Sequence, residues 1–422
     1  MKNAISNLFF IGCLVFLCYF GYSQNIDYAK KIVQKISSPE FYGRGYVNKG
    51  DSIAASFLAE EFKKIGLKKF GDSYFQNFTI GVNRFINSTI VMFDSIELVP
   101  VKDYVVIPSS PETDKKYKIE WITARTLTNQ WVLRQFLSEE YPDRILCIDS
   151  TGLNNPELFA FANTIFSKNY VKAAGIIEQS ARLKFTVRTK IKDFVHVQLS
   201  SDKINYGSDS VYIKIQNSFV ENYTTANLIG YIPGKSDSII MITAHYDHLG
   251  MYGDVIFPGA NDNASGVAMV LSLARSYKKM SPPKYTMVFA LFAAEEAGLL
   301  GSQYMAENLP FEISKIKVLL NFDMVGTGDK GVYVMNAKLH NDINVLMTEL
   351  NNKNKYFDTF YTTGLSYGSD HASFHEKGVK ALFFYTDGDN STYHQPQDTY
   401  DNCTFAVFED MIRFVTDFVD AY

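Results

Sequence analysis

The sequence is poor in cysteine and has no marked excess of charge of either sign. Its 422 residues include 4 Cys, and 41 basic against 45 acidic side chains leave a formal net charge of -4. A chain of this size that is so nearly neutral, and that contains no cluster of Lys and Arg, is not expected to bind nucleic acid. The hydrophobic fraction of 46% and the charged fraction of 20% describe a soluble globular protein instead.

Long hydrophobic runs are also missing, apart from one short run near the N-terminus. Residues from Leu8 to Phe20 are apolar, and Gly21 and Ser23 supply small residues at the -3 and -1 positions of a cleavage site before Gln24. The run is too short, and too close to the terminus, for a comfortable membrane span. Residues 1–23 are therefore predicted to be a signal peptide. The protein is expected to be exported, periplasmic or secreted, with no stable membrane span after cleavage.

Cleavage at this site would remove two of the four cysteines. Cys13 or Cys18 could instead carry a lipid anchor, but neither follows a well-formed lipobox, so this alternative ranks lower and an uncleaved anchor ranks third. Cys147 and Cys403 would remain, and they allow one disulfide at most. The protein is thus not a disulfide scaffold, and its stability must come from a hydrophobic core.

The length of the chain exceeds what one ordinary hydrophobic core supports, so two domains or one elaborated domain are expected. Residues 87–201 consist of short β-rich runs without a cluster of metal-binding side chains. They separate two stretches, 24–86 and 202–422, that both have the character of one core. We interpret 87–201 as a small β-rich inserted domain. The alternative is that its strands extend the main sheet.

In the C-terminal half, apolar strand-like runs alternate with helical patterns. Strands are predicted at 239–243, 285–292, 318–322 and 381–385, and a helix is predicted to begin near Ser265. This alternation is typical of the α/β class. We therefore expect a mixed, mostly parallel sheet flanked by helices.

Side chains that can bind metals follow the carboxyl ends of these four strands, which is where open parallel sheets bind ligands, and one more lies in the loop that enters the predicted helix. The candidates are His245, Asp262, Glu295, Glu296, Asp323 and His394. Zinc prefers imidazole nitrogen and carboxylate oxygen when no thiolate is offered, and catalytic sites keep a position open for water. Five of the six can hold two metal ions if one carboxylate bridges them. The sixth, a carboxylate beside a ligand, can take a proton from water.

The sequence also resembles a known family. The segments HYDHLG, GANDNASGVA, AAEEAGLLGS, NFDMVG, SDHASF and YHQPQDT are similar to the successive motifs of the M28 family of co-catalytic zinc aminopeptidases. The resemblance covers residues 220–422 strongly and 24–85 loosely. It implies the zinc aminopeptidase (phosphorylase/hydrolase-like) fold. The block 87–201 resembles the protease-associated (PA) domain that is often inserted in such enzymes.

Two Zn²⁺ ions and their ligands are implied by this resemblance, residue by residue. His245 and Asp323 would hold one zinc, Glu296 and His394 would hold the other, and Asp262 would bridge the two.

The resemblance implies roles for neighbouring groups as well. Glu295 would be the general base and later the acid, and Tyr393 would help to stabilise the oxyanion. Asp247 would accept a hydrogen bond from His245 and fix its tautomer. The family also implies a cis peptide bond after the bridging aspartate, here Asp262–Asn263.

Three other residues near these motifs carry weaker expectations. Asp370 is expected to support the site structurally, and Asp398 is expected either to orient His394 or to cap a helix. His248 has no role in the motif, and we expect it at most to lie behind the ligands or to face the substrate.

The function that the resemblance implies is hydrolysis of the first peptide bond of peptides with a free N-terminus. Within the same scaffold, a glutaminyl-peptide cyclotransferase and a carboxypeptidase-type enzyme are alternatives. A non-catalytic binding protein is the alternative of another class. The sequence does not fix the side-chain preference, the physiological metal or the oligomeric state.

Overall fold

The computed structural model describes residues 26–149, 155–203, 206–280, 282–329 and 331–422. The predicted signal peptide, residues 1–23, lies outside the described residues. Among the helices in the described ranges, none is both long and apolar enough to cross a membrane.

The chain forms two compact units. The main unit comprises the chain up to Thr79 together with Thr224–Gly250 and Phe257–Tyr422, and the inserted unit comprises Ile80–Tyr223 and Met251–Ile256. The inserted unit is wider than the predicted range 87–201. Its boundary moves outward because strand β9 (Ser210–Ile215) pairs with β2 (Ile90–Phe93) and β5 (Thr113–Ile122) inside this unit.

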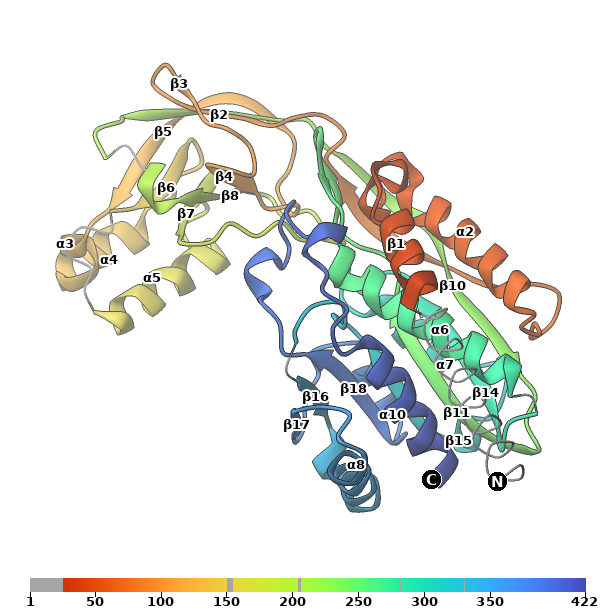
Figure 1. Ribbon diagram of the computed structural model, residues 1–422. Coiled ribbons are helices and arrows are strands. Elements are labelled where there is room, and N and C mark those ends of the chain that lie inside the picture. The colour runs from red at the N-terminus through yellow and green to blue at the C-terminus, as the bar shows by residue number, and fades with distance from the viewer. Residues whose placement is uncertain (1–25, 150–154, 204–205, 281, 330) are drawn as a thin grey trace, which may run out of the picture. The chain divides into compact units, whose positions relative to one another are not determined.

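The main unit is built on a mixed eight-stranded sheet with the order β1-β10-β14-β11-β15-β18-β16-β17 (Figure 1). Its strands span Phe75–Arg84 (β1), Ser218–Ile232 (β10), Ser236–His245 (β11), Tyr285–Phe292 (β14), Ile316–Phe322 (β15), Gly331–Met335 (β16), Thr359–Thr362 (β17) and Ala381–Thr386 (β18). The central neighbours β14, β11, β15 and β18 run parallel, whereas β10 is antiparallel to β14 and β16 to β18. The predicted mixed, mostly parallel sheet is confirmed.

The central strands are apolar because both of their faces are buried. On β11, Met241 packs into a core cluster with Phe292 of β14 and Met305 of α7. Ile240 and Ile242 point to the opposite face by the alternation of a strand, and both are fully buried. The strand predicted at 239–243 is the centre of this element.

The register of the parallel strands brings their carboxyl ends to one edge of the sheet. Thr243 lies beside Asn321 of β15, and His245 lies beside Phe292 of β14. Asp323 follows the last residue of β15, and its main-chain N–H donates to the carbonyl of Phe384 on β18 at 3.0 Å. Residues just beyond these ends are therefore held within reach of one another.

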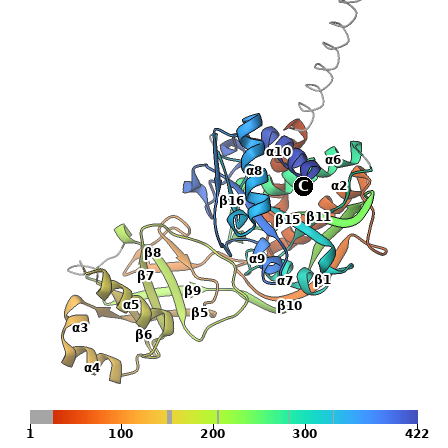
Figure 2. The ribbon, with the colours of Figure 1, turned by 90° about the horizontal axis from the view of Figure 1, so that it is seen from below.

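Helices cover both faces of the main sheet, as Figure 2 shows with α6 and α10 on one side and α7 and α9 on the other. The helices span 26–36, Gly50–Ile65 (α2), Gly266–Lys279 (α6), Leu300–Glu307 (α7), Asn341–Asn354 (α8), His371–His375 (α9) and Phe408–Ala421 (α10). Helix α6 packs on β11, β14 and β15, and α9 packs on β15 and β18. The helix predicted near Ser265 is α6.

The inserted unit has a sheet of its own, with the order β3-β2-β9-β5-β6-β7-β8-β4. The elements not yet given are Ile96–Glu97 (β3), Tyr104–Val106 (β4), Ala124–Thr128 (α3), Gln130–Ser138 (α4), Arg144–Ile148 (β6), Pro156–Lys168 (α5), Gly175–Ser180 (β7) and Val195–Ser200 (β8). Its core cluster includes Phe136, Leu146 and Ile176. A separate sheet with its own core means that these strands do not extend the main sheet.

Both described cysteines are free. Cys147 is fully buried on β6, and Cys403 is partly buried. The single disulfide that the sequence allows is therefore not formed, and the two units depend on their hydrophobic cores.

Candidate metal centre

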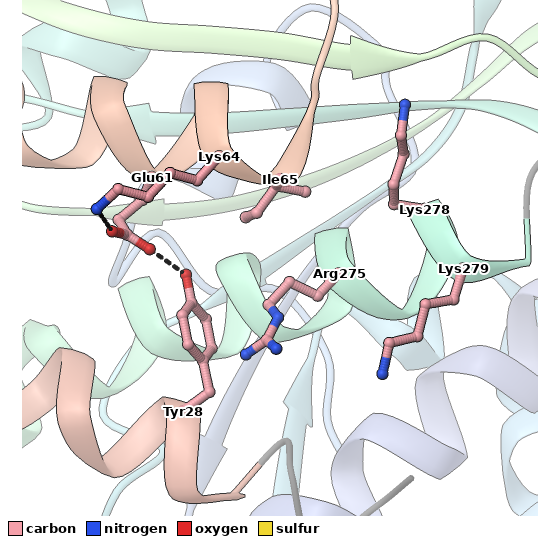
Figure 3. A pocket seen from close by; sticks show the side chains of 7 residues that line it. All are labelled: Tyr28, Glu61, Lys64, Ile65, Arg275, Lys278 and Lys279. Atoms are coloured by element: carbon pink, nitrogen blue, oxygen red, sulfur yellow. Dashed lines mark hydrogen bonds and ion pairs between the residues drawn. The ribbon is translucent and has the colours of Figure 1, made fainter.

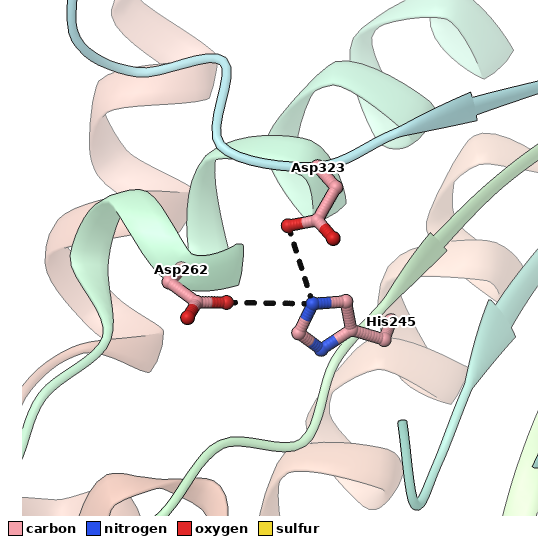
Figure 4. A group of neighbouring side chains, drawn as sticks. All are labelled: His245, Asp262 and Asp323. Atoms are coloured by element: carbon pink, nitrogen blue, oxygen red, sulfur yellow. Dashed lines mark hydrogen bonds and ion pairs between the residues drawn. The ribbon is translucent and has the colours of Figure 1, made fainter. Parts of the chain in front are cut away.

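A first group of metal-binding side chains gathers at the carboxyl edge of the main sheet (Figure 4). Nε2 of His245, at the end of β11, lies 3.4 Å from Oδ1 of Asp262 and 3.3 Å from Oδ1 of Asp323. All three side chains are buried, and their atoms are close enough together to hold one metal ion. The sequence predicted this convergence, although His245 and Asp323 are separated by 78 positions in the chain.

The second carboxylate oxygen of Asp262 faces a different imidazole. Its Oδ2 lies 3.4 Å from Nε2 of His394, and that nitrogen lies 3.2 Å from Oε2 of Glu296. Zinc binds nitrogen and oxygen at about 2.0–2.2 Å in tetrahedral geometry, so two ligands of one ion lie about 3.3 Å apart. The separations of 3.2–3.4 Å around both imidazoles fit that requirement. Asp262 is thus placed to serve two ions with one oxygen each.

A third imidazole, which was expected at most behind the ligands or facing the substrate, lies beside the second group. His248 is fully buried, and its Nδ1 lies 2.7 Å from Oε1 of Glu296 and 3.8 Å from Oδ2 of Asp262. With Asp262 and Glu296 it forms another set of atoms that could hold a metal. The sequence feature that could have indicated it is the second histidine of HYDH, three residues after the predicted ligand His245.

The orientation of His245 comes from a different atom than predicted. Its Nδ1 lies 3.1 Å from the main-chain carbonyl of Asp247, whereas the Asp247 carboxylate is 3.8 Å away. The carbonyl accepts the Nδ1 proton and leaves Nε2 free to face the two carboxylates. The expectation that the Asp247 side chain fixes the tautomer is therefore corrected. Asp247 is the residue that fixes it, but through its main-chain carbonyl.

The Asp247 carboxylate instead holds the segment that carries the two glutamates. Its Oδ1 accepts the main-chain N–H of Glu295 at 3.1 Å, and its Oδ2 accepts that of Glu296 at 3.4 Å. The hydroxyl of Tyr46 also donates to Oδ2 at 3.3 Å. Burial raises the pKa of Asp247 to about 7, with His245 opposing this shift. The carboxylate therefore couples the end of β11 to the loop after β14.

Asp398 holds the main chain of the bridging residue rather than orienting His394. Its Oδ1 accepts the N–H of Asn261 at 2.8 Å, and its Oδ2 accepts the N–H of Asp262 at 3.0 Å. Its own carbonyl accepts the N–H of Ala260 at 3.1 Å. Both expectations for Asp398, an orienting partner of His394 or a helix cap, are replaced by this support of the 260–262 loop.

The Asp398→Asn variant is therefore expected to loosen this loop. An amide keeps one acceptor but turns two N–H donors toward the other main-chain N–H, so one buried hydrogen bond to a charged group is lost. We expect the free energy of unfolding to fall by roughly 2 kcal/mol, measured by urea denaturation. Asp401→Asn, at an exposed position nearby, is the matched control. An Asp398→Asn variant as stable as the control would contradict the support role.

A buried arginine that sequence reasoning missed ties the two metal-bearing loops together. Arg44 is fully buried, and its guanidinium donates only to main-chain carbonyls in the described contacts. The acceptors are the carbonyls of Tyr246 (2.8 Å), Ile36 (3.1 Å), Pro258 (2.6 Å), Gly259 (2.7 Å) and Asp262 (3.2 Å). Burial lowers the pKa of Arg44 to about 10 and carboxylates including Asp262 oppose it, so the group stays charged at neutral pH.

The backbone around Arg44 requires its two neighbouring glycines. Gly43 has φ +59, and a Cβ there would lie 2.4 Å from the carbonyl oxygens of Gly250 and Phe257. A Cβ on Gly45 would lie 2.4 Å from the Cα of Gly250. These close backbone approaches are open only to glycine. They press residues 39–50, which include the 3-10 helices Pro39–Arg44 and Val47–Lys49, against the loop after β11.

The pKa values of the adjacent residues Glu295 and Glu296 are shifted in opposite directions. Burial alone would raise the pKa of Glu296, but His394 and hydrogen bonds from His248 and His394 lower it to about 2. Burial, together with Glu296, raises the pKa of Glu295 well above its usual range, and His245 opposes that shift. Glu296 is thus held as a charged carboxylate, whereas Glu295 binds a proton more tightly than an ordinary glutamate.

Several buried carboxylates lie close together at the carboxyl edge of the main sheet, and Arg44 is a buried arginine near them. Burial also raises the pKa of Asp370 to about 7, with His245 opposing it. Asp370 is fully buried and interacts electrostatically with His245 and Asp323, which agrees with a supporting position beside the ligands. Two divalent cations would balance the charge of the carboxylates that face His245 and His394. The donor set therefore fits the two ions that the family resemblance implies.

The side chain of Tyr393 lies against the second group. Its ring stacks on that of His394, with centroids 3.9 Å apart and an interplanar angle of 24°. Burial and the nearby carboxylates, Asp262 first, raise the pKa of Tyr393, so its hydroxyl keeps its proton. The hydroxyl interacts electrostatically with Asp262, Glu296, Asp323 and Glu295, so it lies close to the carboxylates of the site.

The backbone at three of these segments adopts unfavourable conformations. Ala294, Met324 and His394 have φ values of 58°, 59° and 57°. A residue with a Cβ in this region costs about 1 kcal/mol or more, and such residues gather at functional sites. The peptide bond between Asp262 and Asn263 is cis, as the family resemblance implies.

A separate hollow on the main unit contains none of these ligands (Figure 3). It has a volume of about 370 Å³ and is lined by Tyr28, Glu61, Lys64, Ile65, Arg275, Lys278 and Lys279. Its carboxylate, on Glu61, already accepts hydrogen bonds from Tyr28 and Lys64, both at 2.7 Å. This hollow is distinct from the metal-binding groups at the sheet edge.

Comparisons with known proteins agree with this geometry. Residues 227–419 match the sequence profile of Peptidase family M28. The chain is 34% identical to aminopeptidase YwaD of Bacillus subtilis over 194 residues, which is 43% of this chain and 41% of that protein. It is 30% identical to leucine aminopeptidase 1 of Trichophyton rubrum over 203 residues, 42% of this chain and 54% of that protein. These matches span about half the length of the relatives.

Solved structures agree over nearly the whole chain. A zinc aminopeptidase from Bacillus subtilis superposes with a TM-score of 0.70 at 22% identity, covering 94% of this chain and 93% of that one. An aminopeptidase from an Aneurinibacillus strain gives 0.67 at 21% identity, covering 93% and 92%. At these identities the agreement establishes the fold, with its inserted unit.

Proposed function

We propose that this chain, whose residues 227–419 belong to peptidase family M28, is an exported di-zinc aminopeptidase. The observation that carries the proposal is the division of the Asp262 carboxylate, whose two oxygens each lie 3.4 Å from a different imidazole. His245 and Asp323 would hold one zinc, and Glu296 and His394 would hold the other. Relatives named aminopeptidase and zinc metalloprotease support the choice of metal and reaction.

Each remaining group of the site has a defined task in this proposal. Bound zinc would supply a Lewis acid for the peptide carbonyl and lower the pKa of bound water. Glu295, which is only partly buried, accepts the proton of the attacking water and later returns it to the leaving amine. Its raised pKa makes it a stronger base than an ordinary glutamate. Tyr393 keeps its proton and donates it as a hydrogen bond to the developing oxyanion.

The substrates proposed are peptides with a free N-terminus. The ammonium group would be attracted by Glu295 and Asp323, whose carboxylates both interact with His245. Such an anchor would limit cleavage to the first peptide bond. The export signal at residues 1–23 would deliver the enzyme to the periplasm or the medium, and the inserted unit would correspond to a PA-like domain.

Assays of the purified protein test this proposal. We expect release of p-nitroaniline from Leu-p-nitroanilide, loss of that activity after dialysis against a chelator, and its return with Zn²⁺. N-acetyl-Leu-p-nitroanilide is the matched control, because its blocked amine removes the anchor. Ammonia release from a Gln-peptide without a free amino acid would establish a cyclotransferase instead. Release of a C-terminal residue from a blocked peptide would establish a carboxypeptidase.

A non-catalytic binding protein is the competing class. It would bind zinc with these ligands but turn over none of the substrates. The raised pKa of Glu295 and the stacked Tyr393 beside the ligands favour the enzyme, because a binding site has no need for a tuned base.

A further inference from the structure

We propose that His248 is a positioning residue that donates its Nδ1 proton to Glu296 and so fixes this carboxylate toward His394. The proposal rests on the di-zinc function above. It assigns His248 a role beside the second zinc without making it a ligand. The competing assignment is that His248 itself coordinates that ion.

The distances from the two oxygens of Glu296 to His248 and His394 distinguish a hydrogen bond from shared coordination of a metal ion. Glu296 uses its two oxygens differently: Oε2 lies 3.2 Å from Nε2 of His394, which is the spacing of two ligands on one ion, whereas Oε1 lies 2.7 Å from Nδ1 of His248. A separation of 2.7 Å is that of a charge-assisted hydrogen bond. Nδ1 of His248 is also 3.8 Å from Oδ2 of Asp262, which exceeds the spacing of about 3.3 Å for neighbouring tetrahedral ligands.

The imidazole ring of His248 is fixed independently of any metal. It is fully buried, and Gly259 packs so closely on it that a Cβ there would lie 2.4 Å from Cδ2 and 2.5 Å from Cγ. Its main-chain N–H donates to the carbonyl of Arg44 at 3.3 Å. Residues that hold a metal ligand by hydrogen bonds act in this way, because they fix the ligand's rotamer before the ion arrives.

The second ring nitrogen supports the same tautomer. Nε2 of His248 is buried and has no hydrogen-bond partner among the described residues. A proton on Nε2 would therefore be a buried donor without an acceptor, which is costly. A proton on Nδ1 leaves only an acceptor lone pair unpaired at Nε2, and it makes the 2.7 Å contact with Oε1 of Glu296 a hydrogen bond rather than a contact between two lone pairs.

Substituting His248 should therefore weaken one zinc site and spare the other. Loss of a residue that orients a metal ligand typically lowers metal affinity about 10–100-fold. We expect this loss for the zinc held by Glu296 and His394 in His248→Ala, with the affinity at His245 and Asp323 unchanged. The measurement is a competition titration of Zn²⁺ against a chromophoric chelator, with zinc content after dialysis as a second readout.

Two amide variants decide between the hydrogen bond and direct coordination. Asparagine places an N–H donor near the position of Nδ1, but its amide is a poor zinc ligand, and glutamine carries its donor one bond further out. We expect His248→Asn to keep wild-type affinity at both sites and His248→Gln to resemble His248→Ala. An Asn variant as weak as the Ala variant would overturn the proposal in favour of coordination. If His248→Ala fails to fold, the Asn and Gln pair carries the comparison.

A matched control exists in the inserted unit. Nε2 of His196 lies 3.0 Å from Oε2 of Glu178, another histidine–glutamate contact without a metal ligand nearby. His196→Ala should leave both zinc affinities unchanged. Unchanged affinities in all His248 variants as well would overturn the positioning role. A wild-type protein that takes up fewer than two zinc ions would overturn the di-zinc function first, and the role of His248 with it.

Discussion

The Glu295→Gln variant is expected to turn over Leu-p-nitroanilide roughly 10²–10⁴-fold more slowly than wild type, the range of general acid–base catalysis. The amide keeps the size of the side chain but cannot accept a proton from water. Glu295 is not one of the five proposed zinc ligands, so both zinc ions should stay bound. The expected signature is thus a fall in kcat at constant zinc content.

The matched control for this variant is Glu307→Gln. Glu307 is exposed and contacts only Lys377 among the ion pairs of the described residues. It should behave as wild type. A Glu295→Gln protein that hydrolyses the substrate undiminished would refute the assignment of the base, whereas one that has lost zinc would place Glu295 among the ligands instead.

The Asp262→Asn variant should have the second large effect, on metal content as well as on rate. Asp262 presents one oxygen to His245 and one to His394, and an amide offers one oxygen and one N–H group. We expect zinc content to fall from two ions to one or fewer, measured by elemental analysis after dialysis. Hydrolysis should fall roughly 10³-fold or more, because a site with a lost ion stabilises the oxyanion poorly.

Asp323, which would bind one ion, provides a comparison for Asp262, which would bind two. In the described part of the chain, His245 is the imidazole that Asp323 pairs with, so Asp323→Asn should weaken the binding of one ion and leave the other. Asp237→Asn, at a highly exposed carboxylate paired with Lys315, is the surface control. An Asp262→Asn protein that retains two ions would show that Asp262 does not bridge.

The parts of the site that could be predicted from the sequence are those set by periodicity. The runs 239–243 and 318–322 are uncharged and largely apolar, and the first is also rich in β-branched residues, so both are identified as buried strands. Parallel strands end at a common edge, so His245 and Asp323 had to meet there. The same reasoning predicted an inserted domain that ends at residue 201, before β9, whereas the compact unit continues to Tyr223, because short half-buried strands give a weak pattern.

The contacts that support the ligands could not be predicted in this way. Asp247 and Asp398 act on main-chain N–H groups, and Arg44 acts on main-chain carbonyls. Every residue offers the same main-chain groups, so no residue type in the partner segment marks such a contact. His248 was visible as a metal-binding side chain, but its role depends on the rotamer of Glu296, which only the folded geometry defines.

The hydrogen bonds from the guanidinium of Arg44 limit how far this domain can be shortened from its N-terminal side. Its acceptors Tyr246 and Asp262 lie 202 and 218 positions downstream, beyond the long segment Ile80–Tyr223 of the inserted unit. A gene fragment beginning at residue 227 would leave those carbonyls without their donor in a place closed to water, at a cost of about 1–3 kcal/mol each. Residues 227–419, which match the family profile, therefore depend on Arg44 for their stability. A shortened form of this domain must include residues 39–50.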